Sequence, residues 1–547
     1  MMRRFAKPKN AHILAVLVLL VLLVVGLCTY RDYSFTYDEW WERESSIINY
    51  QYLLKKLIGH DLRLLDVNLS DYESRYYGVA LQLPMVVVEH LNHFSMSLHD
   101  VFIIRHLFTF LICWAGWACL YIFFQKVFQN RWLSLLGLLM ISLYPRFYGE
   151  QFTNVKDMVF TATCCASLMM VALCLEKRRW WVEILAAMVF ALCVNTRVIG
   201  LMIPLLLMGY RILAAVLRKK EIARECLLSI GQLVLTFVFY LIVTPAAWEE
   251  PFTFLPNAFA TFSRFETWDS TIPFLGQMVR GKALPWYYIP VWLLVSVPIW
   301  YLCLLAVGLV TESISLASML HRKQGIAWYY SEHRYGMLCF VMAAAPVALM
   351  LVKPVTMYNS WRHVYYIFPF LVTLMLFGAR WLWRRLSQKN VARRGLCAVM
   401  AVLLIYQTGW IVRQYPMEKV YFNPVGKALA DGMDRDYWYE ALYGQFQYIL
   451  ENDPAEEVVV SCYKHAGIWW NCYLTPEEKS RVRMVQEDHP DTEYIIDSAD
   501  TTYTDSFIGF VPVHRRYVDG ILISTVYVSQ NVIDERFDGR YPKDIGL

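Results

Sequence analysis

The chain carries little charge for its length. Of its 547 residues only 18% are Asp, Glu, Lys or Arg, whereas 57% are apolar, and the mean hydropathy is +0.36. Soluble proteins of this size do not combine so few charges with so much apolar sequence. Repeated uncharged runs near the length of a bilayer span therefore indicate a polytopic membrane protein of mainly α-helical fold.

Patterns typical of several other protein classes are missing. The 13 cysteines show neither metal-ligand spacing nor a disulfide framework, so most are expected to be small buried thiols. Only Cys462 and Cys472 lie in the polar tail, and the sequence does not decide whether they form a disulfide. We find no internal repeats and no paired broken helices, which are typical of transporters. The net charge of +5 does not indicate a nucleic-acid partner, because the basic residues gather in short loops between apolar runs.

The apolar runs predict about 11 transmembrane helices. The first run, 11–30, follows four basic residues and is interpreted as a retained signal anchor with its N-terminus in the cytoplasm. The others are expected near 102–124, 132–148, 158–175, 182–196, 198–217, 227–246, 285–310, 336–352, 363–383 and 396–412. The boundaries within 182–217 stay open, because Asn195–Arg197 must form a very tight turn.

The distribution of basic residues supports this topology. It places 23 Lys and Arg residues in inner segments and only eight in the outer loops after the first loop. Such a bias is typical of a multi-pass protein whose inner loops are cytoplasmic. The polar tail then lies outside the cell membrane, opposite the N-terminus.

Residues 413–547 are predicted to form a small extracytoplasmic α/β domain behind a membrane domain of residues 1–412. We expect a helix at 437–450 and strands at 457–461, 494–497 and 521–528. The tail contains no glycine-rich phosphate loop and no clear catalytic triad. A rigid cap or an acceptor-recognition module without chemistry is the favoured interpretation.

The long first outer loop, 31–100, contains an acidic pair. Asp38 and Glu39 follow the first span closely and lie among aromatic residues. An aromatic belt at the membrane interface does not require two adjacent carboxylates, which repel each other and are costly to desolvate. Within the same loop, 77–91 is predicted to form a short interfacial or re-entrant helix.

Two shorter outer loops combine cations, aromatic residues and an acid or an imidazole. The first contains Arg146, Glu150, Lys156 and Asp157, and the second contains Lys353, Tyr358, Arg362 and His363. Snorkelling explains any single cation at the membrane boundary, but it explains the combination poorly. A site for an anionic lipid headgroup beside a carboxylate base needs such a mixture.

The order of these features resembles the GT-C glycosyltransferases, especially bacterial relatives of protein O-mannosyltransferases (family 39) and of lipid A aminoarabinose transferases. The resemblance covers about residues 10–412. It consists of the signal anchor, the Asp38-Glu39 pair, the short apolar helix, the loop ending at Asp157, and the late Arg362-His363 followed by aromatic residues. No sugar-binding repeat domain of the mannosyltransferase type is found, so a protein acceptor is not implied.

The resemblance implies a glycosyltransferase that moves a sugar from a polyprenyl-phosphate donor to an acceptor at the outer face of a bacterial plasma membrane, with inversion. Asp38 would be the general base, Glu39 would orient it or raise its pKa, and Asp157 would position a substrate. The substrate-binding residues would be Arg146, Lys156, Lys353, Tyr358, Arg362 and His363. The acceptor, a cell-envelope polymer, a lipid or a protein, stays open.

No cofactor is expected. A divalent metal is conceivable because oligosaccharyltransferases belong to the same superfamily, but a lipid monophosphate donor does not need a metal, and no dense cluster of oxygen ligands is visible. Two other classes remain as alternatives, a polytopic lipid or sugar transporter (or flippase) and a non-catalytic membrane scaffold.

Overall fold

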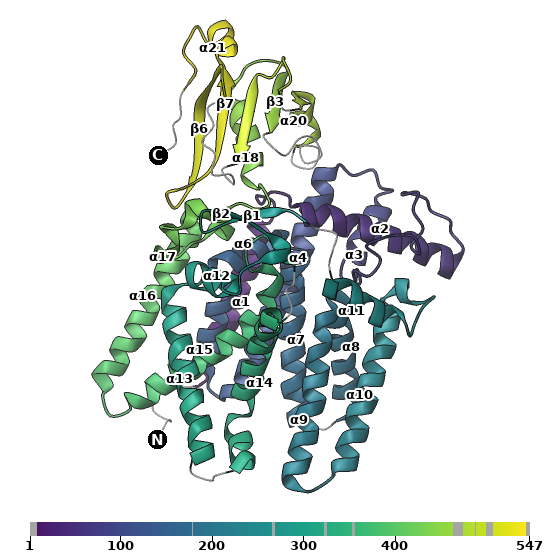
Figure 1. Cartoon of the computed structure of the whole chain (residues 1–547), viewed down its shortest axis with the longest axis vertical. Coiled ribbons are helices and arrows are strands. Elements are labelled where there is room, and N and C mark those ends of the chain that lie inside the picture. The colour runs from purple at the N-terminus through teal and green to yellow at the C-terminus, as the bar shows by residue number, and fades with distance from the viewer. Residues whose placement is uncertain are drawn as a thin grey trace.

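The computed structural model describes residues 8–177, 179–264, 269–321, 325–352, 356–462, 474–486, 488–498 and 507–542. A bundle of long helices occupies most of the molecule, and a five-stranded sheet stands on one end of it (Figure 1). The hairpin of α9 (Met202–Arg218) and α10 (Ile222–Val243) lies at the opposite end of the bundle (Figure 1). The mainly helical membrane fold with a small C-terminal α/β domain, predicted from the sequence, is confirmed.

Eight helical segments in the described part of the chain are long and apolar enough to cross a membrane. Hydrocarbon offers no partner for free backbone groups, so uncharged runs of this length become helices. The segments are α1 (Pro8–Thr29), α4 (Leu98–Phe128), α7 (Asp157–Glu176), η1 (Val198–Leu201) with α9 (Met202–Arg218), α10 (Ile222–Val243), α13 (Ile299–His321), η4 (Arg362–Ile367) with α15 (Phe368–Arg385), and α16 (Asn390–Gln414).

The other three predicted spans are also helical. The region 132–148 divides into α5 (Arg131–Ser142) and α6 (Pro145–Thr153), because Tyr144 precedes a proline and is extended. For the same reason Val297, before Pro298, separates α12 (Tyr288–Ser296) from α13. The remaining two spans are α8 (Trp180–Thr196) and α14 (Gly325–Val352).

The first outer loop is more ordered than its polar sequence suggests. It contains α2 (Tyr37–Ile58) as well as the predicted short helix, which is α3 (Leu83–Leu91). Thr36 and Glu39 form a capping box that starts α2. The acidic pair therefore lies in the first turn of a 22-residue helix, and not in an irregular loop.

The segment between the bundle and the C-terminal sheet packs on the bundle. Residues 415–440 contain η5 (Glu418–Val420), α17 (Pro424–Lys427) and η6 (Ala430–Gly432), which contact α6, α12 and β7 respectively. The outer segment between α10 and α12 contains η2 (Pro245–Ala247), α11 (Phe254–Arg264), the hairpin of β1 (Thr271–Phe274) and β2 (Gln277–Arg280), and η3 (Gly281–Ala283). Gly276 in the hairpin turn donates to the Gly432 carbonyl at 2.9 Å, which ties the hairpin to this segment.

The sheet has the strand order β4-β3-β5-β7-β6. Strand β3 pairs in parallel with β4 and β5, whereas β7 pairs in antiparallel with β5 and β6. Its predicted strands are present as β3 (Val458–Cys462), β5 (Tyr494–Ser498) and β7 (Ile521–Ser529), and β4 (Val482–Val485) and β6 (Phe510–Val518) complete it. The helices are α18 (Ala441–Asn452), which packs on β7 and β5, α20 (Pro476–Ser480) and α21 (Gln530–Arg536).

Candidate functional site

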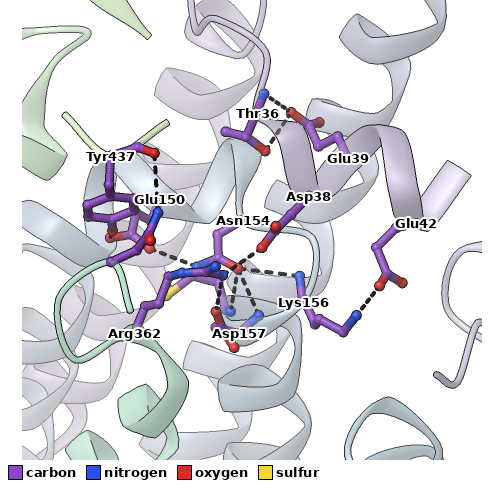
Figure 2. Close-up of polar contacts among 12 residues, drawn as sticks. Thr36, Asp38, Glu39, Glu42, Glu150, Asn154, Lys156, Asp157, Arg362 and Tyr437 are labelled. Atoms are coloured by element: carbon purple, nitrogen blue, oxygen red, sulfur yellow. Dashed lines mark hydrogen bonds and ion pairs between the residues drawn. The ribbon is translucent and has the colours of Figure 1, made fainter. Parts of the chain in front are cut away.

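Two carboxylates from different loops bind one guanidinium. Asp38 Oδ2 lies 2.5 Å and Asp157 Oδ2 lies 2.9 Å from Nη1 of Arg362 (Figure 2). Asp38 comes from the first turn of α2, Asp157 begins α7, and Arg362 begins η4. The structure thus brings together three of the residues predicted from the sequence.

The two carboxylates differ in exposure. The Asp38 side chain is 21% exposed, whereas those of Asp157 and Arg362 are 1% and 2% exposed. Both acids lie at helix N-termini, where free N–H groups favour negative charge. Asp38 is therefore the carboxylate of this group that a substrate can reach.

Aromatic rings line the guanidinium. Cζ of Arg362 lies 5.1 Å from the ring centroids of both Tyr358 and Trp438. His363 packs edge-on against Tyr358, with 4.7 Å between the ring centroids. Both ion pairs of Arg362 use Nη1, and its Nε has no hydrogen-bond partner among the described residues, so the guanidinium has bonding capacity left for another anion.

Two further cations extend the group. Arg197 pairs with Asp157, and Lys156 pairs with Glu42 of α2. The Nζ of Lys156 also lies 3.3 Å from the ring centroid of Tyr77. Lys156 and Arg197 are 14% and 22% exposed, so both border the accessible side of the site. Three cations thus face three carboxylates. A substrate anion must compete with these carboxylates for the cations.

Glu39 does not join this group. Its carboxylate accepts from the backbone N–H of Thr36 at 2.9 Å and lies 3.1 Å from Nε2 of His106, on the side of α2 away from Asp38 (Figure 2). Glu39 is fully buried. The orienting role predicted for Glu39 is therefore corrected to a structural one, because N3 of a capping box faces back to the helix start.

Arg146 lies apart from Arg362. Its Nε donates to the Tyr421 carbonyl at 2.9 Å, and its guanidinium lies 5.2 Å from the Trp292 ring and 5.0 Å from the Phe422 ring. Arg146 is 0% exposed, and its Nη1 and Nη2 have no hydrogen-bond partner among the described residues. Arg146 packs under residues 415–440, and its contact with a substrate stays a prediction. Lys353, also predicted to bind substrate, lies outside the described residues, as does Cys472.

Glu150 links the site to the chain above it. It accepts hydrogen bonds from the hydroxyls of Tyr365 and Tyr437, both at 2.6 Å, and from Nδ2 of Asn154 at 2.7 Å (Figure 2). Oδ1 of Asn154 in turn accepts from the backbone N–H of Asp157 at 2.7 Å. Burial raises the pKa of Glu150, and these three donors oppose that rise.

A second buried ionic cluster lies beside Glu150. Lys419 binds Asp436 at 2.8 Å and Glu440 at 3.0 Å. Burial raises the pKa of Glu440 to about 7, although Lys419 opposes the rise, and burial raises the pKa of Glu418 to about 8. The hydroxyl of Tyr33 donates to Glu418 at 3.2 Å. These buried side chains connect the first outer loop to residues 415–440.

The carboxylates of the site are paired with cations. Asp38 and Asp157 share a guanidinium, and Glu42 binds an ammonium, so the carboxylates are already neutralised by cations. Within the described ranges no three His, Cys, Asp or Glu side chains gather in a way that could hold a metal ion. The residues around Arg362 therefore do not fit a divalent cation.

Four residues of the site escaped the sequence prediction. Glu42 lies one helical turn after Asp38, so the start of α2 could have indicated it. Arg197 was recognised only as a basic residue in an outer turn. Tyr437 and Trp438 lie in the tail, and no local pattern connects them with Arg362.

No family model matches the chain, and no curated protein matches it. Among solved structures it is similar to ArnT from Cupriavidus metallidurans in the apo state (13% identity, 95% of this chain and 98% of that one, TM-score 0.44) and bound to undecaprenyl phosphate (13%, 95% and 98%, 0.42). It is also similar to the Archaeoglobus fulgidus oligosaccharyltransferase tethered with an acceptor peptide (12%, 88% and 69%, 0.43).

Proposed function

We propose that this protein is a membrane glycosyltransferase that takes a sugar from a polyprenyl-phosphate donor and transfers it to an acceptor with inversion. The observation that carries the proposal is the pairing of Asp38, the accessible carboxylate, with Arg362, a buried guanidinium that has free donor capacity. The group lies at the end of the helix bundle that carries the sheet domain, at the start of the α7 and η4–α15 spans (Figure 1). The phosphate group of a polyprenyl phosphate also lies at the membrane surface, at the ends of the spans, while its hydrocarbon chain stays in the bilayer.

The ion pair supplies both the phosphate site and the base. A donor phosphate that binds Arg362 takes the place of the Asp38 carboxylate on the guanidinium. Asp38, released from its partner, then accepts the proton of the acceptor hydroxyl or amine. Binding of the donor phosphate thereby frees Asp38 to act as the base.

The reaction is a single displacement. The acceptor atom forms a bond to the anomeric carbon while the bond from that carbon to the phosphate oxygen breaks. The electron pair leaves with the phosphate oxygen, where Arg362 stabilises the charge, and Lys156 and Arg197 border the same space. The acceptor proton ends on Asp38, and no covalent enzyme intermediate forms. No metal is required, because guanidinium groups carry out the charge stabilisation.

The test uses the full-length protein purified in detergent. Its lipid extract is analysed for polyprenyl phosphates by mass spectrometry, and undecaprenyl phosphate is titrated onto the delipidated protein. We expect co-purification and saturable binding that is weakened by Arg362→Ala. Sugar release is then followed with a panel of undecaprenyl-phosphate sugars and a cell-envelope extract as acceptor. Absence of both binding and sugar release would overturn the proposal.

A further inference from the structure

A short segment of the C-terminal tail covers the guanidinium of the site. We name residues 436–440 the roof segment. Its Trp438 is 3% exposed, and its ring lies 5.1 Å from Cζ of Arg362. The ring of Tyr358 lies at the same distance, so two aromatic side chains restrict the guanidinium. The tail thus contributes a side chain to the site itself.

The roof segment is fixed at both ends. Lys419 is 1% exposed and binds Asp436 at its start and Glu440 at its end. Asp436 also accepts from the backbone N–H groups of Glu440 and Ala441, at 3.1 and 2.9 Å, which closes the segment into a tight turn. Buried ionic contacts therefore hold the roof segment that carries Trp438 at both ends.

The middle of the roof segment is tied to the site. The Tyr437 hydroxyl donates to Glu150 at 2.6 Å, and its carbonyl accepts from Nδ2 of Asn359 at 3.2 Å. Asn359 precedes Arg362 by three residues in the same loop. Tyr437 therefore holds the tail against both the Arg362 loop and α6.

Glu150 coordinates three parts of the site. Besides Tyr437, it receives the hydroxyl of Tyr365, one turn after Arg362, and the amide of Asn154, which caps the turn carrying Asp157. One buried carboxylate thus places the roof segment, the guanidinium loop and the start of α7 relative to one another. Each of these hydrogen bonds restricts the movement of a residue that lies near Arg362 or near one of its partners.

We propose that the roof segment is a positioning element of the phosphate site, in which Trp438, held by the Tyr437–Glu150 hydrogen bond, orients Arg362 toward a lipid-linked phosphate. This inference rests on the proposed function and deepens it. A guanidinium binds phosphate through a planar fork, so its orientation decides how many hydrogen bonds form. Trp438 acts through Arg362 and does not contact the reacting atoms.

The test measures binding of undecaprenyl phosphate to the full-length protein. Trp438→Ala should weaken binding about 10- to 30-fold, because a buried ring over the guanidinium is lost. Trp438→Phe keeps a ring and should recover most of the affinity. Tyr437→Phe removes only the bond to Glu150 and should weaken binding several-fold. In the Arg362→Ala background, Trp438→Ala should cause no further loss, because the two residues act as a unit.

The matched control is Tyr494→Phe. Tyr494 is also a buried tyrosine of the tail, and its hydroxyl donates to Asp453 at 2.6 Å, inside the sheet domain. This variant should lower the melting temperature and leave undecaprenyl phosphate binding unchanged. Unchanged binding in folded Trp438→Ala, or an equal loss with and without Arg362, would overturn the roof segment as a positioning element. Absence of binding by the natural protein would instead overturn the proposed function, and the inference with it.

Discussion

The Asp38 carboxylate lies 2.5 Å from Nη1 of Arg362, although 324 positions separate the two residues in the sequence. The ion pair closes the space between the first outer loop and the start of a late membrane helix. Its Asp38 side chain is 21% exposed and its Arg362 side chain 2% exposed, so the pair is accessible mainly from the Asp38 side. This relationship determines how variants of either residue should behave.

Asp38→Asn should lower the rate of sugar transfer by about two to four orders of magnitude, because the amide cannot accept a proton. The same change should strengthen undecaprenyl phosphate binding, since a competitor for Arg362 loses its charge. Rates with a working donor and acceptor, and lipid titration, measure the two effects. Asp269→Asn is the control, because Asp269 is an exposed carboxylate paired with Lys282 at 3.5 Å. Near-normal transfer by Asp38→Asn would contradict the role as base.

Arg362→Lys should weaken undecaprenyl phosphate binding about 10-fold or more although the charge is conserved, because an ammonium offers no planar fork. Arg362→Ala should cause a greater loss, and it should lower stability because Asp157 loses one of the two cations that pair with it among the described residues. Lipid titration beside melting curves separates the two effects. Arg211→Lys is a matched control, since Arg211 of α9 is a buried arginine bound to Glu183 of α8. If Arg362→Lys binds the lipid as the natural protein does, the bidentate role is wrong.

Glu418→Gln should remove part of the pH dependence of stability. Burial raises the pKa of Glu418 to about 8, whereas an unfolded glutamate titrates near pH 4.3. Between about pH 4.5 and 8 the folded protein keeps a proton that the unfolded chain has lost, so the free energy of unfolding falls as pH rises. The variant should melt at a higher temperature than the natural protein at pH 8.5 and show a smaller fall from pH 5. Glu440, whose pKa burial raises to about 7, leaves a residual slope between about pH 4.5 and 7. Parallel curves for the two proteins would contradict this assignment.

Cysteine labelling in intact cells tests the orientation in the membrane. Ile508 is 98% exposed in the tail, and Asp269 lies beside the β1–β2 hairpin at the same end of the bundle. Ile508→Cys and Asp269→Cys should react with an impermeant maleimide from outside. Val391→Cys, 84% exposed in the first turn of α16, should react only after permeabilisation. Labelling of Asp269→Cys only after permeabilisation would place the site in the cytoplasm and contradict the use of an outer-face donor.

The helices could be predicted from the sequence because uncharged runs of bilayer length have one stable backbone conformation in lipid. The breaks at Tyr144 and Val297 were missed, although each residue precedes a proline that disfavours continued helix. The start of α2 had a local signal, because Thr36 and Glu39 have the spacing of a capping box. This signal also explains why Glu39 faces away from Asp38.

The candidate site was only partly predictable. Asp38, Asp157 and Arg362 each stood out as charged residues in outer loops, where a charge needs a reason. Tyr437 did not, because nothing near it in the sequence reveals a hydrogen bond to Glu150 across 287 positions. Contacts of this kind depend on how the tail packs on the bundle, and no periodicity of apolar residues encodes that packing.

The packing of residues 415–440 on α6 also has a consequence for biosynthesis. A ribosome makes the chain from its N-terminus, so Asp38, Asp157 and Arg362 enter the membrane before Lys419 and Trp438 exist. During that interval Glu150 has one tyrosine donor fewer, and Arg146 lacks the Tyr421 carbonyl. The nascent helix bundle therefore lacks part of the contacts around Arg362. These contacts form only after residues 415–440, in the last quarter of the chain, have been synthesised.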